Sequence, residues 1–469
     1  MKNAKKLILV LAVAVFALAC AACGKKENDP TPTPTQAATS TPTPTQDVKP
    51  TEPPRDLKGL EVVLGDWWSG EDWNKANNAY EEAYWEMMND SMKNHNYTFT
   101  RKNLGGWGNE YTEAQMLAIS KNEPMAQIIT FDATWTAALL SQGAFLDVWN
   151  ISTVDWSDSK WNTAAINAMK IGGGLYGFAA GTEPRTGVFF NKAIFKQLGV
   201  DPELPYNLQA EGKWNWDAFK DLAKSLTKDT DNDGATDIFG VTGQNTVWFT
   251  AFLMSNGTHV ITQDASGKLV MNANDTAVLD ALNYGRTFYD EGYFCTEKEG
   301  DAWDYFKAAF YDGRVAMFIE EQYAISNINE QNIEAGFVCF PYGPAINKPI
   351  SIVRENILIV PSCDSTKSVA EDIMYAYNVY TSVPEEYADD DQRWKAHYEA
   401  LFNDERAVNE TCNNLINKYD QYMNASFLIP SFAPNWLYEL GGGATGAETV
   451  EAHSAEWQTQ VDEFNTAFN

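Results

Sequence analysis

The chain has 469 residues and a formal net charge of −30, with 64 acidic side chains against 34 basic ones. This surplus of carboxylates repels nucleic acids and other polyanions, so it excludes a nucleic-acid partner and favours a neutral ligand or a cation. Aromatic residues make up 13% of the chain, enough to supply both a core and a surface on which a ligand could stack.

The first 22 residues have the pattern of an export signal. Three lysines precede an apolar run over residues 7–19, which is too short to cross a bilayer, and small residues follow it. The segment Ala21-Ala22-Cys23-Gly24 resembles the bacterial lipobox, with Cys23 as the lipidated residue and Cys20 as the rival site. We therefore expect a signal peptide over residues 1–22 and a protein anchored by lipid to the extracytoplasmic face of a bacterial cell membrane.

Residues 23–56 are predicted to be the lipidated cysteine and a tether. Thr-Pro pairs repeat at residues 30–34 and 41–44, and large apolar side chains are almost absent, so this segment cannot bury a core. Proline-rich chain favours an extended conformation that holds a folded body away from the membrane surface. The composition fits a disordered tail on a secreted enzyme equally well, and only the lipobox cysteine favours a membrane anchor.

The body, from Leu57 onward, alternates predicted strands with predicted helices. It exceeds the size at which a single core usually divides, so we expect two lobes. Alternating strands and helices indicate an α/β body with largely parallel sheets. The predicted strands are Leu60–Leu64, Gln127–Phe131, Val315–Ile319 and Asn356–Val360, and the predicted helices include Tyr80–Met92, Trp135–Gln142 and Trp216–Leu226, the last with Asn215 as its cap.

Tryptophan and aspartate stand together where two of these strands end. Trp67 and Trp68 follow the first strand, and Asp132 and Trp135 follow the second. Ligands of α/β proteins bind beyond the carboxyl ends of strands. A sugar ring covers an aromatic face while its hydroxyls donate to carboxylates, so the pattern predicts sugar binding. The alternative for any single tryptophan is packing against a neighbouring helix.

Four phrases along the body resemble one family, the extracellular solute-binding proteins of ABC importers, in the group that includes maltodextrin-binding protein. These phrases are Gly174–Lys192, Trp214–Phe219, Phe310–Phe318 and Phe340–Pro344. The resemblance implies an α/β, two-lobed periplasmic-binding-protein-like clamp, each lobe a sheet flanked by helices, joined by a hinge of crossing segments. The first lobe would comprise residues 57–177 and 341–382, and the second residues 178–340 and 383–469.

The resemblance also implies a ligand, partners and a set of binding residues. We expect a monomer that binds a carbohydrate, most simply an oligosaccharide, delivers it to the permease subunits of an ABC transporter and catalyses no reaction. Tyr323 replaces a common tryptophan, Glu320-Glu321 replaces a common glycine, and a hinge salt bridge is the alternative role for Glu183 and Arg185. The implied ligand-binding residues are Trp67, Trp68, Asp132, Trp135, Glu183, Arg185, Asn245, Trp248, Tyr323, Glu355 and Trp436.

An aspartate-rich segment predicts a structural Ca²⁺ site apart from the ligand. Its alternating oxygen donors and its glycine at the sixth position match the first half of an EF-hand loop, although Gly240 stands where the twelfth-position glutamate is expected. The alternative is a solvated acidic turn. The expected ligands are Asp229, Asp231, Asp233, the backbone of Ala235, and Asp237.

Two other questions stay open from the sequence alone. The spacing of Cys295, Cys339, Cys363 and Cys412 matches no zinc pattern, and they could form disulfides or stay reduced and buried. The competing functions are a surface glycoside hydrolase, which also combines tryptophans with carboxylates, and the same clamp binding a peptide or a cationic solute.

Overall fold

The computed structural model describes residues 55–353, 356–429 and 434–468. The predicted signal peptide, both candidate lipidation sites, nearly all of the tether, and Glu355 lie outside these residues. Within the described ranges, no helix has both the length and the apolarity needed to span a bilayer.

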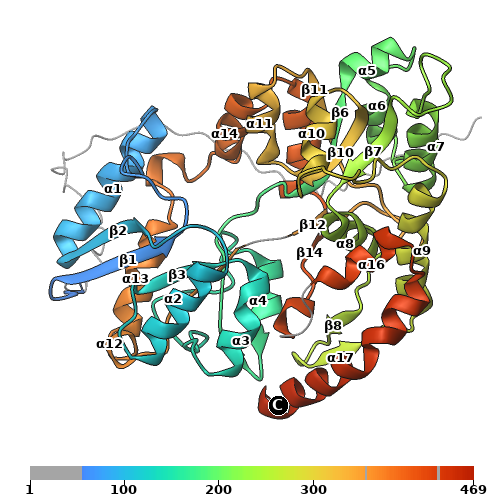
Figure 1. The fold of residues 1–469 in the computed structure, drawn as a ribbon. Coiled ribbons are helices and arrows are strands. Elements are labelled where there is room, and N and C mark those ends of the chain that lie inside the picture. The colour runs from blue at the N-terminus through green and yellow to red at the C-terminus, as the bar shows by residue number, and fades with distance from the viewer. Residues whose placement is uncertain (1–54, 354–355, 430–433, 469) are drawn as a thin grey trace, which may run out of the picture. The chain divides into compact units, whose positions relative to one another are not determined.

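The first sheet contains four strands in the order β13-β3-β1-β2. Strand β1 (Leu60–Asp66) runs parallel to β2 (Tyr97–Asn103) and to β3 (Ile128–Phe131), whereas β13 (Ile357–Ile359) runs antiparallel to β3. Helices α1 (Ala79–His95) and α13 (Ala370–Tyr380) lie beside this sheet (Figure 1). The carboxyl ends of β1, β2 and β3 therefore meet at one rim of the sheet.

The second sheet contains four strands in the order β11-β6-β10-β7. Strand β10 (Val315–Glu321) runs parallel to β7 (Phe239–Gly243) and antiparallel to β6 (Thr186–Asn191), which pairs antiparallel with β11 (Ala335–Cys339). Helices α7 (Trp216–Leu226) and α10 (Tyr305–Tyr311) pack on its strands (Figure 1).

The expectation of largely parallel sheets holds for the first sheet, in which β1 pairs in parallel with both β2 and β3, and is wrong for the second, in which only β7 and β10 pair in parallel. Both sheets also contain antiparallel pairs. In the first sheet, Ile357 at the start of β13 pairs with Phe131 at the end of β3. In the second, Thr186 at the start of β6 pairs with Glu321 at the end of β10. Each of these strands begins at the rim where its neighbour ends, so each runs antiparallel to that neighbour.

The helix predicted behind Asn215 is confirmed in detail. The side chain of Asn215 accepts a hydrogen bond from the backbone N–H of Ala218 at 2.9 Å, which satisfies a donor that the first turn would leave free. Trp216, Phe219 and Leu222 are buried along one face, together with Leu226. The apolar spacing in the sequence thus predicted both the start of this helix and the face that it buries.

The other elements complete the body. The remaining helices are α2 (Asn109–Ser120), α3 (Thr136–Ser141), α4 (Thr163–Met169), α5 (Lys192–Gln197), α6 (Leu204–Ala210), α8 (Asn245–Ser255), α9 (Thr276–Asp290), α11 (Ala324–Glu330), α12 (Asp364–Lys367), α14 (Arg393–Leu401), α15 (Asn413–Asn417), α16 (Leu437–Gly442) and α17 (Gly446–Phe468), with 3-10 turns η1 (Ala133–Trp135), η2 (Glu385–Tyr387), η4 (Ser426–Leu428) and η5 (Pro434–Trp436) and a π-helix η3 (Ala407–Cys412). The short strands are β4 (Lys170–Ile171), β5 (Gly174–Leu175), β8 (Ile261–Gln263), β9 (Leu269–Met271), β12 (Ser351–Ile352) and β14 (Gln421–Tyr422).

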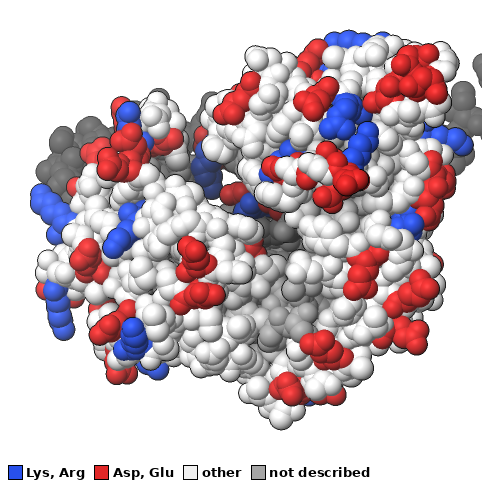
Figure 2. Space-filling view, viewed as in Figure 1, with Lys and Arg blue, Asp and Glu red and all other residues white. Residues whose placement is uncertain are grey.

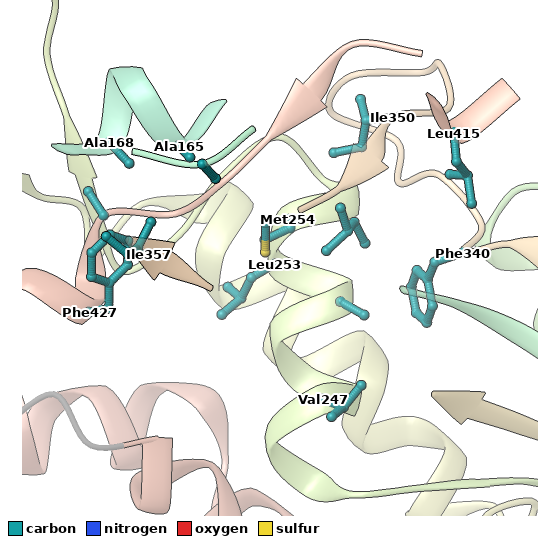
Figure 3. Close-up of a cluster of buried hydrophobic side chains, with 14 of the residues drawn as sticks. Ala165, Ala168, Val247, Leu253, Met254, Phe340, Ile350, Ile357, Leu415 and Phe427 are labelled. Atoms are coloured by element: carbon teal, nitrogen blue, oxygen red, sulfur yellow. The ribbon is translucent and has the colours of Figure 1, made fainter. Parts of the chain in front are cut away.

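The hydrophobic core draws on segments that are far apart in the sequence. Figure 3 shows Leu253 and Met254 of α8 gathered with Ala165 of α4, Ile357 of β13 and Phe427 of η4. All five side chains are buried. Residue 178 is the expected start of the second lobe. This cluster therefore contains residues from before and after that position.

The four cysteines of the body are buried free thiols in the structure. Burial raises the pKa of Cys339 to about 12, so this side chain stays a neutral thiol at ordinary pH. These cysteines therefore act as small apolar core residues.

Candidate functional site

Four tryptophans gather at the rim where β1, β2 and β3 end, and we call Trp67, Trp68, Trp107 and Trp135 the aromatic rim. The ring centroid of Trp67 lies 4.8 Å from that of Trp68 and 5.4 Å from that of Trp135, and Trp107 lies 5.3 Å from Trp135. Trp68 is 50% exposed and Trp107 is 66% exposed. The rings thus form a connected surface that remains open to solvent, which is uncommon for side chains of this size.

The aromatic rim rests on a buried tyrosine. The ring of Tyr111 lies 5.5 Å from that of Trp67, and its hydroxyl donates to the backbone carbonyl of Thr130 on β3 at 3.0 Å. Burial, with a smaller contribution from the charge of Asp66, raises the pKa of Tyr111 above its usual range. Tyr111 is thus a neutral support that fixes the exposed rings to the sheet.

Asp132 holds the turn that carries Trp135. Its Oδ1 atom accepts hydrogen bonds from the N–H and the hydroxyl of Thr134, at 2.9 Å and 2.6 Å, and so caps η1. Its Oδ2 atom receives no hydrogen bond from the described part of the chain. One carboxylate oxygen is therefore available to a ligand three residues before the Trp135 ring.

Trp107 was not predicted from the sequence. It follows β2, whose sequence YTFTRKN ends in polar and charged residues and gives no strong strand signal. The signal that could have revealed this loop is the group of glycines around Trp107. Gly105 and Gly108 adopt φ values of +142° and +135°, which favour glycine. Trp107 thus lies in the short loop between β2 and α2, where its ring is 66% exposed.

The second sheet has a rim of different chemistry, and we call Glu183, Arg185, Glu321, Gln322 and Tyr323 the charged rim. Because β6 starts where β10 ends, the residues before β6 meet the residues after β10. Arg185 lies 3.3 Å from a carboxylate oxygen of Glu183 and 3.3 Å from one of Glu321. The amide of Gln322 donates to Glu183 at 2.8 Å. The salt bridge considered for Glu183 and Arg185 is therefore present, and half of the Tyr323 side chain is exposed beside it.

Two further segments begin at the same rim of the second sheet as the charged rim, and they carry Asn245 and Trp303. Asn245 begins α8 just after β7 and accepts a hydrogen bond from the Tyr289 hydroxyl at 2.9 Å. Phe294 pairs in parallel with Val241 of β7, so the segment after it also leaves from the carboxyl end. That segment carries Trp303, which is 72% exposed. Trp303 was not predicted as a site residue, because no strand was predicted at residue 294.

The structure removes Trp248 and Trp436 from the candidate site. Trp248 is 0% exposed, its indole N–H donates to the carbonyl of Gly285 at 3.2 Å, and its ring lies 4.9 Å from that of Phe294. Trp436 is also buried, with its ring 5.2 Å from Trp457. Both side chains pack in the core, so neither offers a free face to a sugar in this structure.

The aspartate-rich segment lies before the amino end of β7, away from the charged rim. Carboxylate oxygens of Asp229, Asp231 and Asp237 lie within 4.8 Å of one another. Hydrogen bonds from the hydroxyl and the N–H of Thr230 lower the pKa of Asp237, which favours its charged form. Asp233 accepts a hydrogen bond from the N–H of Ala235 at 2.8 Å and is not part of the group of three.

Figure 2 shows acidic side chains spread over the viewed face, with basic side chains between them. The exposed surface of this face therefore does not form a continuous basic patch of the kind that binds nucleic acid. This view agrees with the exclusion drawn from the net charge.

Several solved structures share this fold. The cyclic alpha-maltosyl-1,6-maltose binding protein from Arthrobacter globiformis matches with a TM-score of 0.60 and 16% identity, covering 87% of this chain and 99% of that one. The GacH receptor of Streptomyces glaucescens, solved unliganded and with acarbose, matches with a TM-score of 0.56 and 16% identity over 86% and 99%. The MalE domain from Bdellovibrio bacteriovorus, bound to maltotriose, matches with a TM-score of 0.55 and 12% identity over 86% and 100%.

These likenesses define the class of the fold, a two-lobed periplasmic binding protein. The sequence also matches the pattern of the bacterial extracellular solute-binding proteins over residues 95–360, more than half of the chain. The chain belongs to this family. No curated protein matches it by sequence.

Proposed function

We propose that this protein captures a carbohydrate, in particular an oligosaccharide, between its two lobes and delivers it intact to an ABC transporter permease. The observation that supports this proposal most is the aromatic rim. Its exposed rings stand at the carboxyl ends of parallel strands, where ligands of α/β proteins bind, and an aromatic face matches the apolar face of a sugar ring. Neighbouring rings of this number suit several linked sugar units better than one.

The charged rim would supply the polar half of the same site. Carboxylates, a guanidinium and an amide accept from and donate to sugar hydroxyls, which fixes the orientation of a ligand that the aromatic rings hold by area. A ligand that contacts both rims stabilises the closed form of a two-lobed protein, and a transporter can recognise that form. No bond of the ligand need change in this cycle.

We further propose that the protein is a lipid-anchored monomer on the extracytoplasmic face of the membrane, with Cys23 as the lipidated residue. The sequence motif and its Thr-Pro tether support this proposal. Mass spectrometry of the N-terminal peptide from membrane fractions tests it, because lipid on Cys20, or an unlipidated N-terminus, contradicts Cys23 as the site.

A thermal-shift screen against mono- and oligosaccharides, with chromatography of every stabilising sugar afterwards, tests the main proposal. A sugar that raises the melting temperature and is recovered intact supports a binding protein, because a ligand that binds only the folded state stabilises it. Recovery of cleaved sugar would instead indicate the glycoside hydrolase. Peptides and polyamines are screened in parallel. If they stabilise the protein and sugars do not, the same two-lobed fold binds a peptide or a cationic solute instead.

We also propose that the aspartate-rich segment binds Ca²⁺ in a structural role. Three carboxylates within 4.8 Å match the oxygen ligands that Ca²⁺ takes, and Asp233 with the carbonyl of Ala235 would complete the shell after a small rearrangement. Removal of Ca²⁺ with a chelator should lower the melting temperature while sugar binding persists. An Asp231→Asn variant should lose most of this chelator response, and an unchanged wild-type melting temperature would contradict the proposal.

A further inference from the structure

An ion pair joins β1 to β2 directly behind the aromatic rim. Asp66 is the last residue of β1, and its side chain is 0% exposed. Arg101 of β2 reaches one oxygen of this carboxylate with two nitrogens, at 2.6 Å and 3.2 Å. An ion pair with one fully buried partner costs desolvation free energy, so its presence at a rim calls for an explanation beyond stability.

The same carboxylate sets the direction of the chain at Trp67 and Trp68. Oδ1 of Asp66 accepts the backbone N–H groups of Trp68 and Ser69, at 3.0 Å and 2.7 Å. Oδ2 accepts the Ser69 hydroxyl at 2.6 Å in addition to Arg101. Among the described residues, the donors to the Asp66 carboxylate are thus in the turn that carries the two tryptophans or on the guanidinium of Arg101.

Arg101 also contacts the exposed ring itself. Its guanidinium carbon lies over the Trp68 ring, 5.8 Å from the centroid, which is within the range of a cation–π interaction. The indole is half exposed, so the guanidinium covers part of it and leaves the rest to solvent. Arg101 therefore restrains both the turn, through Asp66, and the ring, through direct contact.

We propose that Arg101, paired with Asp66, is a positioning residue for the ligand: it holds Trp68 in the orientation in which a sugar stacks on it. Arg101 acts through Trp68 and does not itself contact the sugar. A ring that is already ordered loses less side-chain entropy when the ligand binds, so the pair raises affinity by preorganisation. This inference rests on the proposed sugar-binding function.

A double-mutant cycle on sugar affinity tests the inference. Isothermal titration calorimetry would compare the wild type, Arg101→Met, Trp68→Ala and the double variant, using the sugar that the thermal-shift screen identifies. In an otherwise wild-type protein, Arg101→Met should weaken sugar binding about tenfold. A loss of this size corresponds to the upper part of the range for a partly buried cation–π contact. In the Trp68→Ala background, Arg101→Met should lower sugar affinity by less than about twofold, because the ring that Arg101 positions is absent. Equal losses in both backgrounds, or no loss in the wild type, would overturn the inference.

Two further variants separate positioning from stability. Arg101→Met leaves the buried Asp66 without its cation, so Arg101→Lys is needed, which keeps the charge but not the planar guanidinium. It should keep the urea midpoint near that of the wild type and still weaken sugar binding; wild-type affinity in this variant would contradict the positioning role. Arg55→Met breaks an arginine–aspartate pair of the same length with Asp372, 2.6 Å, which is more exposed and lies away from the rim, and it should leave affinity unchanged.

A spectroscopic measurement without sugar keeps this inference separate from the proposed function. The difference between the near-ultraviolet circular dichroism of the wild type and of Trp68→Ala isolates the signal of Trp68. That signal should shrink in the Arg101→Met background, because the ring is no longer held. An unchanged signal contradicts the inference, whereas failure of the wild type to bind any sugar contradicts only the proposed function.

Discussion

The two rims occupy equivalent places in their sheets and differ in the contacts that their own side chains make with one another. The aromatic rim is joined by ring contacts of 4.8 to 5.4 Å, and its rings rest on a buried tyrosine. The charged rim is joined by ion pairs around Arg185 and an amide hydrogen bond. Ring contacts depend on area and tolerate sliding, whereas ion pairs fix positions and respond to charge. From this comparison we expect the aromatic rim to supply most of the affinity for the proposed sugar and the charged rim to supply most of its orientation.

The largest expected effect separates a core tryptophan from those of the aromatic rim. Trp248→Ala removes a fully buried ring, so it should lower the free energy of unfolding by about 3 to 5 kcal/mol. Urea unfolding followed by circular dichroism measures this loss. A loss below about 1 kcal/mol, within the range of surface substitutions, would mean that Trp248 is not a core residue.

The next effect concerns the ion pairs of the charged rim. Arg185→Met leaves the carboxylate of Glu321 without this cation, and breaking this largely buried pair costs about 3 kcal/mol of stability. The Glu183 carboxylate is 47% exposed, so water can solvate it when the cation is removed. Lys196→Met is a matched control, because the Lys196–Glu334 pair is exposed and should cost less than about 1 kcal/mol. Equal urea midpoints for the two variants would show that the ion pairs of Arg185 contribute no more to stability than an exposed ion pair does.

A smaller effect, on binding alone, is expected at the aromatic rim. Trp68→Ala removes a half-exposed ring, so sugar affinity should fall by about 2 kcal/mol, the usual size for a binding hot spot, while the urea midpoint hardly moves. Titration calorimetry and urea unfolding on the same preparation measure both quantities. A large loss of stability with unchanged affinity would mark Trp68 as structural and would break the contrast between the rims.

The smallest effect is the response of affinity to salt. A neutral sugar held mainly by rings should bind with nearly the same affinity between 0.05 and 0.5 M NaCl, changing by about twofold or less, since salt screens only interactions between charges. Titrations at the two salt concentrations measure this. A steep fall in affinity would point to a charged ligand and to the cation-binding alternative.

The fold was largely predictable, because the strands and helices follow apolar periodicity and the order of family phrases. The helix behind Asn215 has one apolar face, so its spacing predicted its burial. Strand β2 carries polar and charged residues at its end and gave no such signal, so the loop after it and Trp107 were missed. The expectation of largely parallel sheets failed for the second sheet, because β6 begins at the rim where β10 ends and so runs antiparallel to both of its neighbours.

The site was only partly predictable, because burial depends on tertiary packing. Trp248 follows a strand, as Trp68 does, and the family resemblance implied that it binds sugar. Helix α8 has no polar face, however, and from Phe249 to Ser255 only Thr250 is not buried, so its tryptophan packs inside. Trp68 instead lies in a turn that Asp66 holds open to solvent. The residue type and its place after a strand are the same, and only the packing of the following segment separates the two roles.

Hydroxyl-radical footprinting of the protein with and without a saturating sugar would show whether one ligand contacts both rims, because it reports on both in one experiment. We expect sugar to protect Trp68 and Trp107 of the aromatic rim and Tyr323 of the charged rim together, at the same sugar concentration. Met125, which is exposed near the amino end of β3, should stay equally reactive and serves as the control. Protection of neither rim, or protection confined to residues outside both, would contradict the claim that one sugar is held between them.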